Sequence, residues 1–180
     1  MNLEESLLNY AGRYLGDVHV ANCLSFLSNA SLPFGREHAE GHFTGSAWLV
    51  DASGARVLLT HHRKLDRWLQ LGGHADGDND LAAVALREAG EESGLSGLTV
   101  EHDIFDVDRH WIPERPHEPG HWHYDVRYVV TAGVHDTFAV SDESLDLAWV
   151  SIETLATTDD IDESLRRMAQ KWLARKASAF

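Results

Sequence analysis

The chain has 180 residues, and its 43% hydrophobic content is ordinary for a protein that buries a proper core. Its formal net charge is −14, from 29 acidic and 15 basic side chains. Such a field repels polyanions, because nonspecific nucleic-acid binding relies on Lys and Arg that neutralise phosphates. The composition therefore excludes a general nucleic-acid binder and favours small ligands that arrive with their own cations.

The expected compartment follows from cysteine usage and hydropathy. The single Cys23 cannot form an internal disulfide, and a lone cysteine is most often a buried apolar residue. Residues 1–5 lack the basic start of a signal peptide, and the longest apolar runs are too short to span a bilayer. We therefore expect a cytoplasmic protein with no membrane partner.

The first forty residues are expected to form a helical extension. Apolar spacing over residues 3–27 predicts two short helices that meet at Gly16, with Asp17 as a cap for the second. A polar connector around Pro33 follows. Packing against the core or a partner subunit is the expected role of residues 1–40, and substrate recognition is the alternative.

The rest of the chain alternates strand-like runs and turns. Strands are expected at residues 43–51, 56–62, 68–71, 98–107, 121–132 and 149–152, and a closing amphipathic helix at about 162–176. A further helix is expected between the third and fourth strands. This order of strands, helix, strands and helix predicts an α+β layered domain.

The segment from Gly73 to Leu95 carries most of the chemistry. It reads as a loop that runs into a helix, and Ser93-Gly94 supplies the glycine expected after the last turn. A helix there places Glu88, Glu91 and Glu92 on one face, because residues three and four apart lie one above the other. Such carboxylates repel one another, so a bound cation would compensate them. A solvated acidic face is the alternative.

This segment resembles the signature of the Nudix hydrolases, G-x5-E-x7-R-E-U-x-E-E-x-G-U, in which U is aliphatic. The residues on its fixed positions are Gly73, Arg87, Glu88, Ala89, Glu91, Glu92, Gly94 and Leu95. One position departs, because Asn79 stands where the family has its first glutamate. In the family that glutamate typically pairs with the arginine. Either Asn79 accepts a hydrogen bond from Arg87, or Asp80 takes over the charge.

The resemblance implies a three-layer αβα Nudix fold with a mixed sheet over residues 41–180. It also implies a divalent-metal-dependent hydrolase that cleaves a pyrophosphate linkage by water attack at phosphorus. The expected substrate is a nucleoside diphosphate linked to another moiety, or a similar organic pyrophosphate. A small phosphorylated metabolite or nucleotide is thus the expected partner, and a homodimer is a possible assembly.

Mg²⁺ is the expected ion, with Mn²⁺ as a substitute, because hard cations prefer oxygen ligands. By analogy with family members, Glu88, Glu91 and Glu92 would supply carboxylates and Gly72 a backbone carbonyl. Arg87 is expected to face away from these glutamates and brace the loop. The general base is one of the helix glutamates or Glu143, for which a solvated loop carboxylate is the alternative.

Several other side chains are candidates for substrate contact. His121, His123 and Asp125 alternate with apolar residues, so they would share one face of a strand that lines the cleft, binds zinc or is plain polar surface. Trp111 falls in an expected loop and would stack on a base or anchor that loop. His74, directly after the glycines, would contact phosphate or a metal-bound water.

Two other functions are compatible with the sequence. A protein that senses a nucleotide without cleaving it is compatible with Asn79 in place of the glutamate. Isoprenoid diphosphate isomerisation would require a cysteine and a glutamate poised at an allylic carbon, but Cys23 lies outside the resembling region.

Overall fold

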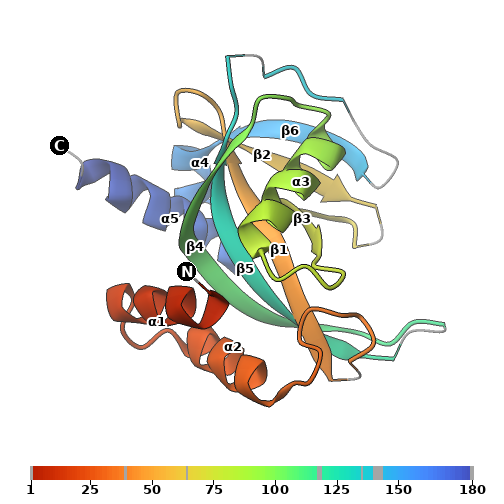
Figure 1. The fold of residues 1–180 in the computed structure, drawn as a ribbon. Helices are drawn as coiled ribbons and strands as arrows, with labels where there is room; N and C mark the ends of the chain where they lie inside the picture. The colour runs from red at the N-terminus through yellow and green to blue at the C-terminus, as the bar shows by residue number, and fades with distance from the viewer. Residues whose placement is uncertain are drawn as a thin grey trace. The chain divides into compact units, whose positions relative to one another are not determined.

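The computed structural model describes residues 2–38, 40–63, 65–116, 119–134, 136–139 and 144–178 (Figure 1). The elements follow in the order α1 (Leu3–Arg13), α2 (Val18–Asn29), β1 (Gly41–Val50), β2 (Arg56–His62), β3 (Arg67–His74), α3 (Leu81–Ser93), β4 (Thr99–Ile112), β5 (His121–Thr131), β6 (Ser144–Ser151), α4 (Ile152–Thr157) and α5 (Glu163–Ala177). None of the helices in these ranges is long and apolar enough to cross a membrane.

The strands are hydrogen-bonded in the order β4-β5-β1-β3-β2-β6. Strand β2 runs antiparallel to β1, β3 and β6. Because β1 and β3 are both antiparallel to β2, they run parallel to each other and the sheet is mixed. The predicted α+β fold with a mixed sheet and N-terminal helices is confirmed.

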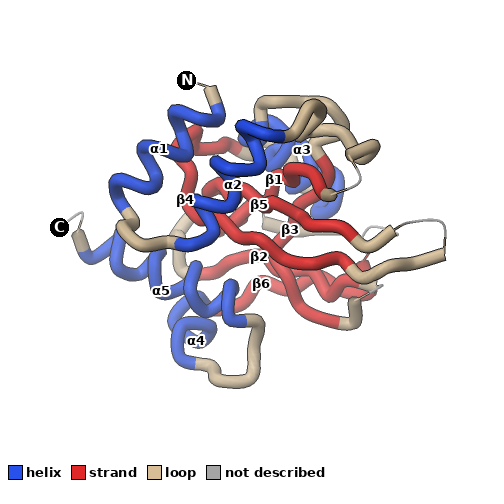
Figure 2. The backbone as a smooth tube through the Cα atoms, turned by 90° about the horizontal axis from the view of Figure 1, so that it is seen from below, coloured by secondary structure: helices blue, strands red, loops and turns tan. Residues whose placement is uncertain are grey.

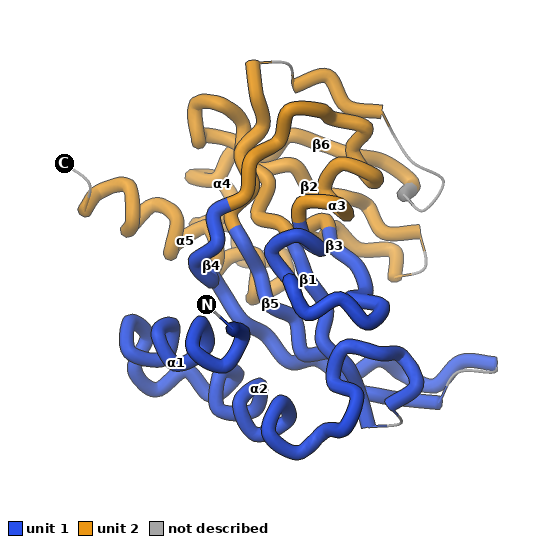
Figure 3. Tube along the Cα trace, viewed as in Figure 1, with its two compact units in different colours: residues 1–46, 72–85, 101–128 blue, residues 47–71, 86–100, 129–180 orange. Residues whose placement is uncertain are grey.

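The chain divides into two compact units (Figure 3). The first comprises residues 1–46, 72–85 and 101–128, and the second comprises residues 47–71, 86–100 and 129–180. Strands β1, β3, β4 and β5 and helix α3 each contribute residues to both units.

In the first unit, the N-terminal segment forms the two predicted helices, and α1 and α2 pack against each other (Figure 2). Asp17 caps α2, because its side chain accepts a hydrogen bond from the backbone N–H of His19 at 2.9 Å. Phe26 of α2 stacks on Tyr124 of β5 with ring centroids 4.1 Å apart. The extension therefore packs on a strand of its own chain.

In the second unit, β2 pairs with β6 along its whole length, and α4 and α5 pack together (Figure 2). The predicted closing helix is confirmed, with Asp162 as its N-cap. The indole N–H of Trp172 on this helix donates to the Gly54 carbonyl at 2.8 Å. This hydrogen bond fixes α5 to the turn between β1 and β2. The short helix α4, which Ser151 caps, was not predicted.

Strands β3, β4 and β6 extend beyond the predicted ranges, and β3 covers Arg67–His74 rather than 68–71. Strand β6 begins at Ser144 rather than at 149, and β4 continues to Ile112 rather than ending at 107. Strand β4 stops directly before Pro113, which cannot donate a ladder hydrogen bond. Trp111 is therefore a strand residue, and the prediction that it lies in a loop is wrong.

Gly45 in β1 is required by the close approach of α3. A Cβ at this position would lie 2.7 Å from the carbonyl oxygen of Leu81 and 2.9 Å from a methyl carbon of Val84. The first turn of α3 thus rests directly on the β1 backbone.

We expect Gly45→Ala to destabilise the protein by about 1–3 kcal/mol, because the obstructing oxygen belongs to backbone and cannot swing away. The matched control is Gly12→Ala in α1, where a Cβ would meet nothing within 4 Å. Alanine there should stabilise by about 0.5–1 kcal/mol, since glycine costs conformational entropy in a helix. Denaturant unfolding measures both; equal free energies of unfolding for the two variants would contradict this account.

Candidate active site and a histidine cluster

The acidic face predicted for α3 is present in the second unit. Helix α3 runs through Ser93, so Glu88, Glu91 and Glu92 lie on one face, three and four residues apart. Glu91 is exposed, and Glu88 and Glu92 are partly buried. Gly94 ends the helix with φ +67°, as the sequence predicted. We call these three residues the acidic trio.

Arg87 contributes to this face rather than turning away from it. Its guanidinium Nη2 donates to Glu88 Oε1 at 2.9 Å, and the Glu88 side chain is 18% exposed. The expectation that Arg87 faces away from the glutamates is therefore wrong. The long, flexible side chain of Arg87 places its guanidinium beside the Glu88 carboxylate. This positive charge offsets part of the repulsion in the acidic trio.

The loop before α3 is held by groups that the sequence pattern did not reveal. Arg36 in the N-terminal connector donates to both carboxylate oxygens of Asp76, at 2.5 and 2.8 Å. The Gly77 N–H donates to the Phe34 carbonyl at 2.9 Å. The extension thus braces the signature loop of this chain, in which Asn79 replaces the family's bracing glutamate.

Asp80 acts as the N-cap of α3. Its Oδ1 accepts a hydrogen bond from the Ala83 N–H at 3.1 Å, and its own N–H donates to Asp78 Oδ1. A carboxylate here satisfies an otherwise unpaired helix N–H and interacts favourably with the helix dipole. This cap is a role for Asp80 that differs from the predicted pairing with Arg87.

Gly72 lies where β3 closely approaches β1, in the first unit. A Cβ at Gly72 would come within 2.2 Å of Ser46 Oγ and 2.7 Å of Ser46 Cα, so any larger residue would push the strands apart. This packing explains the glycine. The metal-binding carbonyl expected at Gly72 stays a prediction.

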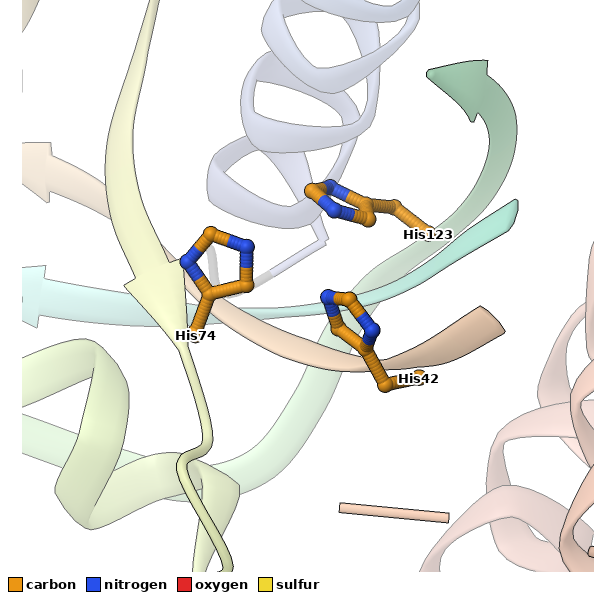
Figure 4. Close-up of side chains that lie close together, drawn as sticks. All are labelled: His42, His74 and His123. Carbon is orange, nitrogen blue, oxygen red and sulfur yellow. The ribbon is translucent and has the colours of Figure 1, made fainter. Parts of the chain in front are cut away.

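Three histidines from three strands of the first unit converge (Figure 4). His42 on β1, His74 on β3 and His123 on β5 each offer one ring nitrogen, and these three nitrogens lie within 4.8 Å of one another. Their ring centroids are 4.8 to 5.1 Å apart. His42 is 2% exposed, while His74 and His123 are partly buried. We call these residues the histidine cluster.

The shared strand face predicted for His121, His123 and Asp125 is confirmed, but the three residues differ in surroundings. His121 Nε2 lies 3.2 Å from His123 Nε2, and His121 Nδ1 lies 2.9 Å from the Pro119 carbonyl oxygen. His110 of β4 also contacts the His123 ring, with centroids 5.4 Å apart. Imidazoles therefore surround His123 on several sides.

Asp125 is part of a buried network and is only 1% exposed. Its Oδ1 accepts from Thr44 Oγ1 at 2.9 Å and from Ser46 Oγ at 2.7 Å, and its Oδ2 accepts from Arg127 Nε at 2.7 Å. Arg127 is 2% exposed and also pairs with Asp106 and Asp108. These donors occupy the Asp125 carboxylate, which favours positioning β1 and β5 over contact with substrate.

Trp111 is 51% exposed, although its ring has a partner. It packs edge to face on Trp122 with centroids 5.2 Å apart, and Arg109 lies 3.7 Å above the Trp122 ring. Both alternatives for Trp111, a base platform and a packed anchor, are compatible with this placement. Glu143 lies outside the described residues.

Burial makes two members of the histidine cluster, His42 and His123, strongly resistant to protonation. The pKa of His42 is lowered to about 4, mainly by burial and also by the neighbouring His74, His121 and Arg36, against a smaller opposing effect of Asp76. The pKa of His123 is lowered to about 2, mainly by burial and also by the neighbouring His110, His42, His74 and His121. Both imidazoles are therefore neutral at neutral pH.

This depression predicts a loss of stability in acid. The unfolded chain takes up protons on His42 below about pH 6.5, whereas the folded chain does so only near pH 4, so stability falls as pH drops through this window. For the metal-free protein, we expect His42→Gln to remove on the order of 1 kcal/mol of the change in unfolding free energy between pH 7 and 5. Urea unfolding with a chelator present measures it. The exposed His102→Gln should keep the wild-type pH dependence; an unchanged slope in His42→Gln would refute the argument.

Comparison with known proteins identifies the class of this domain. The sequence model of the NUDIX domain matches residues 42–172. The chain therefore belongs to the Nudix family, and the resemblance seen in the signature is confirmed. No curated protein matches the chain.

Solved structures agree with this assignment. A NUDIX-family hydrolase from Clostridium perfringens is 26% identical, with a TM-score of 0.57, and the match covers 74% of this chain and 97% of that one. An Ap4A hydrolase from C. elegans is 18% identical, with a TM-score of 0.59 and coverage of 76% and 98%. A MutT protein from Methanosarcina mazei Go1 is 19% identical, with a TM-score of 0.57 and coverage of 76% and 96%. The protein is thus a Nudix-type hydrolase.

Cys23 does not have the surroundings of a catalytic thiol. It is completely buried in α2, and burial raises its pKa, as do Asp125 and Asp17. Nucleophilic cysteines instead have lowered pKa values and partial exposure. This placement counts against the isoprenoid diphosphate isomerase alternative.

Proposed function

We propose that the protein hydrolyses the pyrophosphate linkage of a nucleoside diphosphate joined to another moiety, or of a similar organic pyrophosphate, with Mg²⁺ or Mn²⁺. The acidic trio on α3 is the observation that carries this proposal. Family membership and the fold shared with an Ap4A hydrolase support the substrate class. The net charge of −14 supports a small substrate neutralised by cations rather than a nucleic acid.

The donor set fits a hard divalent cation. Glu88, Glu91 and Glu92 offer carboxylate oxygens from one helix face, and all three have some exposure to solvent. Mg²⁺ prefers oxygen ligands and keeps several of its waters, so a few carboxylates form a suitable donor set. A bound ion would supply polarisation of the phosphoryl oxygens and a more acidic water.

The residues of the proposed site have different roles in metal binding, proton transfer and substrate contact. The acidic trio holds the metal ions, one of its members or Glu143 accepts the proton from the attacking water, and Arg87 orients Glu88 through their ion pair. His74, His123 and Trp111 are proposed to contact the substrate, and Asp125 to act behind them through Ser46 and Arg127. We further propose that residues 41–180 form the hydrolase domain and residues 1–40 its extension, since the family match begins at residue 42.

We expect Glu88→Gln and Glu92→Gln each to lower kcat by about 100-fold or more, because the neutral amide removes a charge that the metal and the reacting water require. Release of phosphate or nucleoside monophosphate measures this over dinucleotide polyphosphates, nucleotide sugars, nucleoside triphosphates and coenzymes. Glu153→Gln, at an exposed position on α4, is the matched control and should keep wild-type turnover. Full activity without divalent metal would contradict the proposal.

The same panel distinguishes the sensor alternative. Tight binding of a nucleotide by the wild-type protein, with no turnover of any substrate in the presence of Mg²⁺, would favour a binding protein. Hydrolysis in water labelled with heavy oxygen identifies the atom that the water attacks, because attack at phosphorus places the label in the phosphate product.

Glu143→Gln tests the placement of the general base. If Glu143 accepts the proton, its amide variant should lower kcat by about 100-fold or more and leave metal affinity nearly unchanged. A variant with wild-type turnover would exclude Glu143 from the mechanism and leave the helix glutamates as the candidates.

A further inference from the structure

We propose that His42, His74 and His123 form a binding site for Zn²⁺ or a chemically similar first-row divalent ion, with ligands separate from those of the acidic trio. The site consists of imidazole nitrogens, which zinc, copper, nickel and iron accept. Mg²⁺ prefers oxygen and would not select it. The proposal does not depend on the hydrolysis reaction.

Within the described part of the chain, His42 lacks the hydrogen bonds that a buried imidazole needs. Neither of its ring nitrogens has a hydrogen-bond partner among the described residues, although the side chain is 2% exposed. Burying a polar group without a partner costs free energy, so native proteins almost always satisfy such groups through protein, water or an ion. A metal–nitrogen bond would satisfy the ring nitrogen that faces the cluster.

The three ring nitrogens are close enough together for one ion to bind all of them. Three nitrogens 4.8 Å apart are each about 2.8 Å from their common centre, whereas a Zn–N bond is about 2.0–2.1 Å long. Each nitrogen must therefore move by less than about 1 Å to reach a central ion, a displacement that side-chain rotation supplies. The three rings come from separate strands and already point toward one another (Figure 4).

The hydrogen bonds of His121 determine which nitrogen of His123 carries a lone pair. A carbonyl oxygen only accepts, so His121 Nδ1–H donates to Pro119, and in the neutral tautomer with this proton the His121 Nε2 is an acceptor. His123 Nε2–H then donates to His121, which leaves His123 Nδ1 as the free acceptor. Histidine ligands of metals typically donate their other ring N–H in this way.

The protonation state of the cluster is consistent with this role. A metal ligand must be a neutral imidazole, and burial keeps His42 and His123 neutral at physiological pH. Three protein ligands would leave one tetrahedral position for water or an anionic oxygen, as in open zinc sites.

Equilibrium dialysis of the untagged, chelator-treated full chain against Zn²⁺, with excess Mg²⁺ present, tests the proposal. We expect one zinc ion per chain in the wild type. His74→Gln and His123→Gln should each weaken the affinity by about 100-fold or more, since even outer-shell changes cost about 10- to 100-fold. His102→Gln, an exposed histidine outside the cluster, is the matched control and should bind as the wild type does.

Two further measurements keep the test independent of folding and of the hydrolysis proposal. Co²⁺ should give an absorption spectrum typical of tetrahedral nitrogen ligation, and Zn²⁺ should raise the melting temperature of the wild type but not of His42→Gln. Glu88→Gln should leave zinc affinity unchanged. Absence of zinc from the wild type, wild-type affinity in the histidine variants, or loss of zinc in Glu88→Gln would each overturn the proposal.

Discussion

The repulsion among three carboxylates on one face of α3 is the constraint on which the proposed chemistry depends. Glu88, Glu91 and Glu92 lie three and four residues apart, and like charges at this spacing destabilise a helix. Arg87 offsets part of that repulsion through Glu88, but one guanidinium leaves a net negative face. A divalent cation would neutralise such a face, and we propose that this cation supports hydrolysis in this member of the Nudix family.

Much of the remaining structure positions α3 and the loop before it. Gly45 lets the first turn of α3 rest on β1, and Asp80 caps that turn. Arg36 and Phe34 hold the loop at Asp76 and Gly77. The N-terminal extension therefore does more than cover a strand, because its connector supplies bracing beside the position where Asn79 replaces a glutamate.

The sequence predicted those features of the fold that depend on interactions between residues close together in the chain. The face shared by the acidic trio, the stop at Gly94 and the cap at Asp17 all depend on residues within a few positions of one another. Strand β4 was predicted too short because its polar end resembles a loop in the sequence. In the structure the strand continues to the residue before Pro113, which cannot donate a ladder hydrogen bond. Arg87 was misplaced because its Cα direction does not determine where a long side chain ends.

The histidine cluster could not be predicted in the same way. His42 has no local signal, and it meets His74 and His123 only because β1 lies between β5 and β3 in the sheet. The same limit applies to the contact of Arg36 with Asp76, which joins residues 40 positions apart. Strand order is a property of the whole chain, so sites that depend on it are seen only in the fold.

Anomalous diffraction from crystals soaked in Mn²⁺ with a non-hydrolysable pyrophosphate tests the central claim most directly. We expect an anomalous peak within coordination distance of the Glu88, Glu91 and Glu92 carboxylates. Density for the bound pyrophosphate with no manganese peak beside those three side chains would contradict the account.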